Sequence, residues 1–122
     1  MHKDEFNIGF YDLKDGTKPA EDFIAGLPPK MQAKVLRAVG MLKTNGLELR
    51  EPYSKHLDDG IFEIRSQVGS DISRVLYFFM VGRRIILTHG FIKKTQKTPS
   101  SEIARAKRYR AEYLGRKERN NE

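Results

Sequence analysis

The sequence predicts one α+β domain, in which helices pack on a small and largely antiparallel sheet. Three observations lead to this prediction. The chain has 122 residues, the common size of a single domain. A strand-like segment comes first and two amphipathic segments follow it. Three apolar runs joined by short turns come next, before a long basic segment at the end.

The first strand is predicted over residues 6–11, where apolar side chains alternate with small or polar ones. Two helices are predicted after it, because prolines suit a first helical turn and apolar residues then recur at helical spacing. These helices cover about residues 19–26 and 28–46. Since the connection between them is short, they form a helical hairpin.

Residues 47–57 are polar and are predicted to be irregular. Three strands are predicted next, over residues 61–68, 72–81 and 84–92, and tight turns join them into an antiparallel meander. The middle strand is apolar on both faces apart from Arg74, so we expect it at the centre of the sheet.

The last helix is predicted to begin at Thr98-Pro99, a cap followed by a first-turn proline, and to end near Leu114. Residues 115–122 are expected to fray. We expect the helices on one face of the sheet and an open opposite face. The absence of repeats and linkers in residues 1–122 favours a single domain.

Several chemistries are excluded by composition. With no cysteine, the chain has no disulfide, no thiolate zinc site and no thiol nucleophile. The three histidines are far apart in sequence, and no glycine loop for phosphate or nucleophile elbow is present. We therefore expect no metal and no cofactor. No apolar run is long enough to cross a bilayer, and the first residues do not resemble a secretory signal, so a cytoplasmic location is expected.

The net charge of +7 is unevenly distributed. Residues 1–60 carry 9 basic and 10 acidic side chains, a net charge of −1, whereas residues 61–122 carry 14 and 6, a net charge of +8. A concentrated positive field attracts polyanions, and nucleic acid is the commonest of these in the cytoplasm. The alternative is that the charge serves solubility alone.

Candidate site residues begin with the strand 61–68, where alternation places Glu63 and Arg65 on one face. Arg74 interrupts the most apolar strand, where an arginine needs a partner. Either it forms a structural ion pair with Glu63, or it clamps a phosphate with its planar guanidinium. We expect that Arg74→Ala leaves the fold intact and abolishes the function.

A second set of candidates lies where the last strand ends. His89, Phe91, Lys93 and Lys94 bring an imidazole, an aromatic ring and two ammonium groups to the sheet edge. Phe91 could stack on an unpaired base, and Gly90 would allow a close backbone approach. The alternatives are that His89 is a packed histidine and that Phe91 is a core aromatic ring. For the basic residues of the terminal helix, the alternative to RNA binding is a solvated face.

Four motifs together resemble the RelE/HigB toxin family in its phage-related HigB-like branch. They are Leu57-x-x-Gly60-x-Phe62-Glu63-Ile64-Arg65, Ser73-Arg74-Val75-Leu76-Tyr77, Leu87-x-His89-Gly90-Phe91-x-Lys93-Lys94-Thr95 and Thr98-Pro99. The resemblance implies the toxin of a type II toxin–antitoxin system, an mRNA interferase that cuts mRNA in the ribosomal A site. It also implies silencing by an antitoxin with a helix-turn-helix domain.

The resemblance further implies a metal-free reaction in which the 2′-hydroxyl of the RNA attacks the adjacent phosphate. Arg65, Arg74 and Lys94 would stabilise the phosphorane, and Glu63 or His89 would move protons. The residues expected to bind RNA are Lys93, Phe91 and Lys97. ParE relatives share the fold and inhibit DNA gyrase, so a non-catalytic toxin with a protein target is the alternative.

Overall fold

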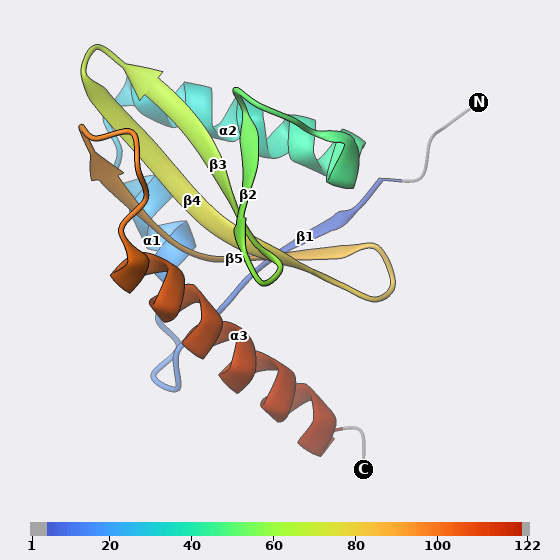
Figure 1. Ribbon diagram of the computed structural model, residues 1–122. Coiled ribbons are helices and arrows are strands. Elements are labelled where there is room, and N and C mark those ends of the chain that lie inside the picture. Colours follow the sequence, from blue (N-terminus) through green and yellow to red (C-terminus); the bar gives the residue numbers. More distant parts are fainter. Residues whose placement is uncertain (1–4, 121–122) are drawn as a thin grey trace.

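The computed structural model describes residues 5–120, with side chains described through Lys117, and it confirms the predicted α+β architecture (Figure 1). The elements are β1 (Asn7–Phe10), α1 (Pro19–Ala25), α2 (Pro29–Asn45), the 3-10 turn η1 (Gly46–Glu48), β2 (Ser54–Asp58), β3 (Ile61–Val68), β4 (Asp71–Met80), β5 (Arg84–Lys93) and α3 (Ser100–Asn120). The five strands form one sheet in the order β1-β5-β4-β3-β2. β1 is parallel to β5, and all other neighbours are antiparallel.

The predicted meander is present as β3, β4 and β5, with β4 at the centre of the sheet as expected. The prediction that residues 47–57 are irregular was wrong in part, because β2 forms there and pairs with β3. The sequence does not indicate this strand, because Lys55 and His56 are both exposed on this edge and give no apolar alternation. Burial of Ser54, whose hydroxyl lies 2.5 Å from that of Tyr77, fastens β2 to the core.

One face of the sheet packs against α1 and α2. Alternate strand residues supply this core, together with the apolar faces of both helices. The buried members are Ala20, Ile24, Leu27, Met31, Val35, Ala38, Leu42, Ile64, Val75, Tyr77, Ile85 and Leu87. α1 lies so close to β5 that a Cβ on Gly90 would meet the Phe23 ring at 2.2 Å. The close approach that we expected at Gly90 is therefore an internal packing contact.

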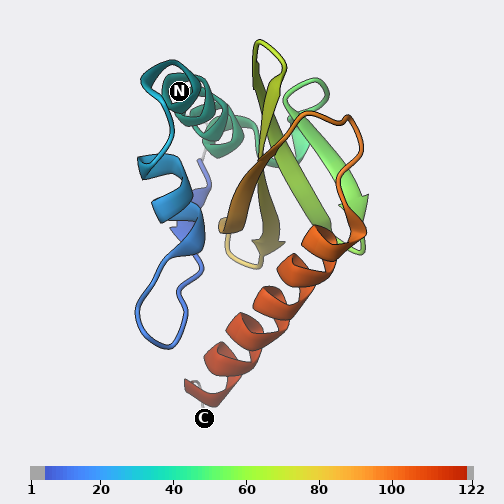
Figure 2. The same ribbon diagram turned by 90° about the vertical axis from the view of Figure 1, so that its left-hand side faces the viewer.

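The opposite face is not open as expected, because α3 packs across it (Figure 2). Ala106, Tyr109 and Tyr113 recur at helical spacing and face the sheet, where the Tyr11 ring stacks on Tyr109 at 4.5 Å between centroids. Burial, together with the Glu112 carboxylate that accepts its hydroxyl hydrogen bond, raises the pKa of Tyr11 to about 12.

The terminal helix is also longer than predicted. It continues past Leu114 to Asn120, so residues 115–120 are helical rather than frayed, and residues 121–122 lie outside the described part of the chain. Arg116 explains the extension, because it donates to Asp12 Oδ1 at 2.8 Å and also binds Glu112. These bonds hold the end of the helix to the segment that follows β1.

Candidate functional site

The sheet register brings most of the predicted site residues onto one face. Glu63 on β3 lies opposite Leu76 on β4, which lies opposite His89 on β5. In the next row, Arg65 lies opposite Arg74, and Arg74 lies opposite Phe91. Because alternate residues of a strand share a face, both rows point to the side of the sheet on which α3 packs. Lys93, opposite Ile72, begins a third row.

His89 reaches this face because of a β-bulge in β5. Leu76 pairs with His89 and Tyr77 with Leu87, so Thr88 is an extra residue without a partner of its own. In a regular strand without this bulge, His89 would lie on the same face as Leu87, which packs in the core under α1 and α2. Thr88 is buried, and its hydroxyl donates to the Leu76 carbonyl at 3.2 Å.

A buried ion cluster occupies the centre of this face, and we call Glu63, Arg65, Arg74 and Thr98 the arginine cluster. Arg65 Nε donates to Glu63 Oε2 at 2.5 Å, and Arg74 Nε lies 3.6 Å from Glu63 Oε1. Thr98 donates its hydroxyl hydrogen bond to the same carboxylate. Glu63 and Arg74 are fully buried, whereas the Arg65 side chain is 21% exposed. The predicted structural ion pair between Glu63 and Arg74 is therefore present.

The cluster is covered by the connection from β5 to α3, residues 94–99, which we call the strap. Arg74 Nη2 donates to the carbonyl of Gln96 at 2.9 Å and to that of Thr95. Arg65 donates to the backbone and the side-chain oxygen of Gln96. Strap oxygens thus hold the guanidinium donors that would otherwise be available to a phosphate.

Arg74 has unused hydrogen-bonding capacity. Among the described residues, neither its Nε nor its Nη1 has an acceptor within hydrogen-bonding distance. Burial lowers the pKa of Arg74, and the neighbouring Arg65 cation lowers it further, while Glu63 opposes both effects. A buried arginine with unsatisfied donors is costly, and both strap carbonyls bind the third nitrogen, Nη2.

His89 lies under the first turn of α3 and is almost completely buried. Its Nε2 lies 3.1 Å from Glu102 Oε1, and its Nδ1 lies 3.1 Å from the Thr88 hydroxyl. Burial lowers the pKa of His89, although the Glu102 carboxylate acts in the opposite direction. The imidazole is therefore neutral at pH 7, and α3 separates it from solvent.

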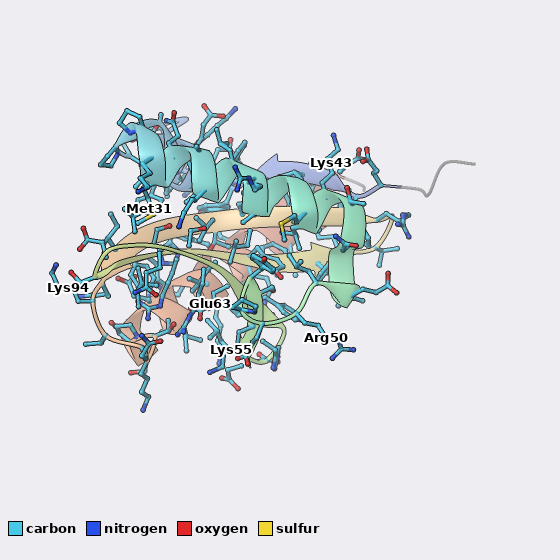
Figure 3. All side chains as sticks on the ribbon, turned by 90° about the horizontal axis from the view of Figure 1, so that it is seen from above. Met31, Lys43, Arg50, Lys55, Glu63 and Lys94 are labelled. Carbon is cyan, nitrogen blue, oxygen red and sulfur yellow. The ribbon has the colours of Figure 1, made fainter. Side chains whose placement is uncertain are left out.

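The lysines at the end of β5 differ from one another. Lys93 is exposed and shares the face of the arginine cluster. Lys94 lies at the end of the sheet, away from Glu63 (Figure 3), where its Nζ is 3.0 Å from Asp71 Oδ1 and from Ser70 Oγ. Lys97 is exposed on the strap, and Phe91 is half-buried beside His89. The structure therefore separates Lys94 from the arginines with which we expected it to act.

The basic residues of α3 are partly engaged in structural ion pairs. Lys107 lies 2.5 Å from Asp58, and Arg110 lies 3.0 Å from Asp59 in the β2–β3 turn. These contacts fasten the helix to the meander and leave fewer free cations on α3 than its sequence suggests. Arg105 lies 3.8 Å from Glu102.

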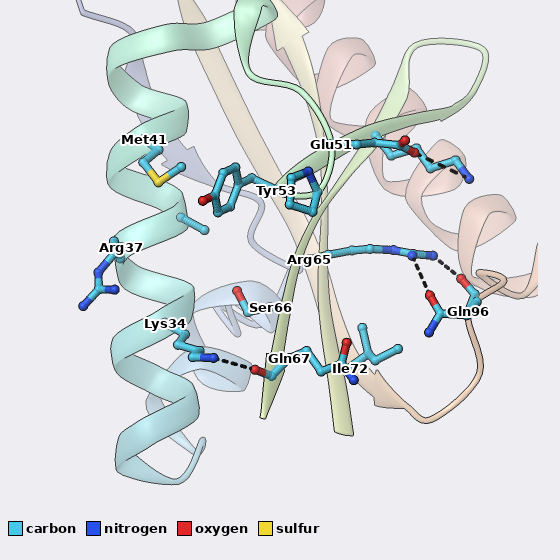
Figure 4. A pocket seen from close by; sticks show the side chains of 13 residues that line it. Lys34, Arg37, Met41, Glu51, Tyr53, Arg65, Ser66, Gln67, Ile72 and Gln96 are labelled. Carbon is cyan, nitrogen blue, oxygen red and sulfur yellow. Dashed lines mark hydrogen bonds and ion pairs between the residues drawn. The ribbon is translucent and has the colours of Figure 1, made fainter. Parts of the chain in front are cut away.

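Sequence reasoning missed a groove of about 540 Å³ between α2 and the edge of β3 (Figure 4). Lys34 and Arg37 on α2, Tyr53 before β2, and Arg65 on β3 contribute to its lining. Sequence reasoning made no assignment for the polar residues of α2, and residues 47–57 were predicted to be irregular. Only the tertiary packing of α2 beside β3 brings these side chains together.

The described residues contain neither a group of metal ligands nor a helix that could cross a membrane. Within residues 5–120, no three histidine, aspartate or glutamate side chains gather in a group that could hold a metal ion. In the same part of the chain, no helix has the length and apolar character that a membrane crossing requires.

A mixed five-stranded sheet, a helical hairpin on one face and a basic helix on the other define a small α+β protein with a RelE-like fold. The chain belongs to the family described as Phage derived protein Gp49-like (DUF891), whose sequence model matches residues 22–111. This is a RelE/HigB-like toxin family. No curated protein matches the chain.

Proposed function

We propose that this protein is the toxin of a type II toxin–antitoxin system and that it cleaves mRNA at the ribosome without a metal. The family supports the toxin assignment, since it is related to RelE-type toxins, which are endoribonucleases. The observation that carries the chemistry is the arginine cluster, in which a carboxylate and two guanidinium groups share one face of the sheet.

In the proposed reaction, the RNA 2′-oxygen forms a bond to the adjacent phosphorus while the bond from phosphorus to the 5′-oxygen breaks. A base removes the 2′-hydroxyl proton, and an acid returns a proton to the leaving 5′-oxygen. The products are a 2′,3′-cyclic phosphate and a 5′-hydroxyl. Arg65 and Arg74 stabilise the phosphorane once the strap carbonyls release them, and Lys93 holds the backbone.

Two groups are suited to the proton transfers. Glu63 is in direct contact with both arginines, so a phosphate bound by those arginines would lie beside its carboxylate. His89 lies in the same row as Glu63, on the other side of Leu76 of β4, and its lowered pKa keeps the imidazole able to accept a proton at pH 7. We also propose a helix-turn-helix antitoxin as the partner that silences the toxin.

The experiment is to induce the protein in cells and to map new 5′-hydroxyl ends in messenger RNA, with Arg65→Ala and Arg108→Ala as a matched pair. Arg65 contacts Glu63, whereas Arg108 is exposed on α3. Cuts within translated messages are expected from the wild type and from Arg108→Ala, and they should disappear in Arg65→Ala. Growth arrest without any new ends contradicts the nuclease.

One observation favours a second candidate, a non-catalytic toxin that binds a protein such as DNA gyrase. Glu63 and Arg74 are fully buried, and His89 is 2% exposed, so three candidate catalytic groups are closed to substrate. In that case the basic surface would recognise an acidic protein face. The same mapping experiment separates the candidates, because only the nuclease leaves cut messages.

A further inference from the structure

The groove beside α2 exists because β2 is shorter than β3. Ser54, the first residue of β2, pairs with Ile64, so β3 continues through Val68 with β4 on one side and no strand on the other. A further backbone bond runs from Arg65 N to the Tyr53 carbonyl at 2.9 Å. α2 lies beside this free edge, and Lys34 Nζ donates to the Gln67 carbonyl at 2.8 Å across the floor of the groove.

The groove is positively charged. Lys34, Arg37, Lys55 and Arg65 line it, and Glu51 is the acidic lining residue, 4.0 Å from Lys55. Among the described residues, no carboxylate lies within ion-pairing distance of Lys34 or Arg37. The lining therefore attracts an anion, and two of its cations have no carboxylate partner in the part of the chain that the structure describes.

One aromatic ring is presented in this groove. Tyr53 is 47% exposed and lies beside Met41 of α2 (Figure 4). An exposed ring between cations is the arrangement that holds unpaired bases, since the base stacks on the ring while the cations take its phosphates. The volume of about 540 Å³ falls within the range of about 300–1,000 Å³ that is typical of small-ligand sites.

The groove is continuous with the arginine cluster. Arg65 and Gln96 line the groove, and Gln96 is also the strap residue that binds Arg65 and Arg74. In Figure 4 the Arg65 side chain extends from β3 toward Gln96, on the side of the strand away from α2. A strand of RNA with a phosphate at Arg65 would therefore have a neighbouring nucleotide within reach of Tyr53.

We propose that this groove binds one unpaired nucleotide next to the phosphate held by the arginine cluster, with its base on Tyr53 and its phosphate on Arg37 and Lys34. The proposal rests on the proposed function for its ligand class. An acidic peptide added to the edge of β3 is less favoured, because Gln67, whose carbonyl faces that edge, is already bound by Lys34. A base also explains the exposed ring, which a peptide backbone does not need.

The test uses a fluorescent 2′-O-methyl RNA hexamer, which has no free 2′-hydroxyl and cannot be cut. Its affinity is measured by anisotropy for the wild type, Tyr53→Phe, Tyr53→Ala, Lys34→Gln/Arg37→Gln and Lys30→Gln/Lys43→Gln. The last variant is the matched control, since it removes two exposed cations from α2 outside the groove lining.

Tyr53→Phe is expected to bind like the wild type, and Tyr53→Ala at least about fivefold more weakly, the lower end of a lost stacking contact. The groove variant, Lys34→Gln/Arg37→Gln, should flatten the slope of log affinity against log salt concentration by about 1.4, which is about 0.7 for each lost phosphate contact. The control variant should leave that slope nearly unchanged.

Equal affinities for the wild type, Tyr53→Ala and the groove variant overturn the proposal, as does a wild type that does not bind the hexamer. Binding of polyglutamate that is lost in the groove variant, without loss of hexamer binding, assigns the groove to an acidic peptide and also overturns it. Because the hexamer cannot be cut, these outcomes are independent of the mapped 5′-hydroxyl ends that decide the nuclease.

Discussion

Arg65 on β3 and Arg74 on β4 lie directly opposite each other and point to the same face of the sheet. Like charges at such positions repel, so the pair depends on the Glu63 carboxylate that contacts both guanidinium groups. The two neighbouring guanidinium groups are suited to binding a phosphate, and their contacts with Glu63 also make them part of the folded core.

We predict that Glu63→Gln destabilises the protein by about 3–5 kcal/mol, because it leaves two partly or fully buried arginines without a counter-charge. Arg74→Met should cost less, since Glu63 then retains Arg65. Urea unfolding of both variants measures the difference. Similar midpoints for Glu63→Gln and the wild type would show that the carboxylate does not hold the cluster together.

This burial revises our expectation for Arg74→Ala, which we predicted from the sequence to leave the fold intact. Arg74 is fully buried and binds two strap carbonyls, so the alanine variant should lose stability together with any activity. Arg65→Ala is the cleaner probe of function, because the Arg65 side chain is partly exposed.

His89 should make stability depend on pH. Burial lowers its pKa in the folded protein, so the unfolded chain binds more protons below its ordinary pKa of about 6.5. The stability that comes from neutral His89 is therefore present above about pH 6.5 and is lost as the pH falls toward the lowered folded value. We predict that urea midpoints between pH 5 and 8 fall with acid less steeply in His89→Gln than in the wild type.

His56→Gln provides the control for this prediction, because His56 is exposed on β2. Its pH profile should follow that of the wild type. If both variants keep the full acid dependence, its source lies in other groups, such as the carboxylates of surface ion pairs.

Lys93 and Lys94 should contribute unequally to RNA binding. Lys93→Gln is expected to flatten the salt dependence of hexamer binding by about 0.7, whereas Lys94→Gln should change it little, because Lys94 already pairs with Asp71. Both variants should unfold within about 0.5 kcal/mol of the wild type, as exposed residues usually do. A larger salt effect from Lys94 would contradict the inference that its ion pair with Asp71 keeps it from the RNA.

The strap should compete with an anionic ligand. Gln96→Ala removes the side-chain bond to Arg65 at 3.3 Å while leaving the backbone carbonyl contacts in place. We therefore predict an increase of about twofold or more in hexamer affinity, the effect of about 0.5 kcal/mol for one lost internal bond. Gln32→Ala should have no effect, because Gln32 lies on α2 and donates to the Ile24 carbonyl of α1. Weaker binding of Gln96→Ala would mean that the side chain contacts RNA itself.

Much of this arrangement follows from local patterns in the sequence. Alternation in residues 61–68 correctly placed Glu63 and Arg65 on one face, and the apolar run around Arg74 correctly placed β4 at the centre. These features depend on neighbouring residues alone, which is why periodicity finds them. The pairing of Arg74 with Glu63 was one of two alternatives predicted for Arg74, and it followed from the cost of an unpaired buried charge.

Other features depend on contacts between distant segments. The bulge at Thr88 has no signature in composition, yet it decides which face His89 occupies. The strap closes over Arg65 and Arg74 through the carbonyls of Thr95 and Gln96, which any residue type could supply. The groove at Tyr53 requires α2 and β3 to pack side by side. No local pattern encodes such contacts.

The parallel pairing of β1 with β5 has a consequence for synthesis of the chain. Asn7, near the amino terminus, pairs with Arg84, so the first strand made has no neighbour until the fifth is complete. Contacts between residues so far apart are slow to form. A nascent chain therefore carries β1 unpaired through most of translation, and the arginine cluster forms only after the strap and Thr98 have left the ribosome. The cluster thus depends on segments that are synthesised after the two strands that carry Glu63, Arg65 and Arg74.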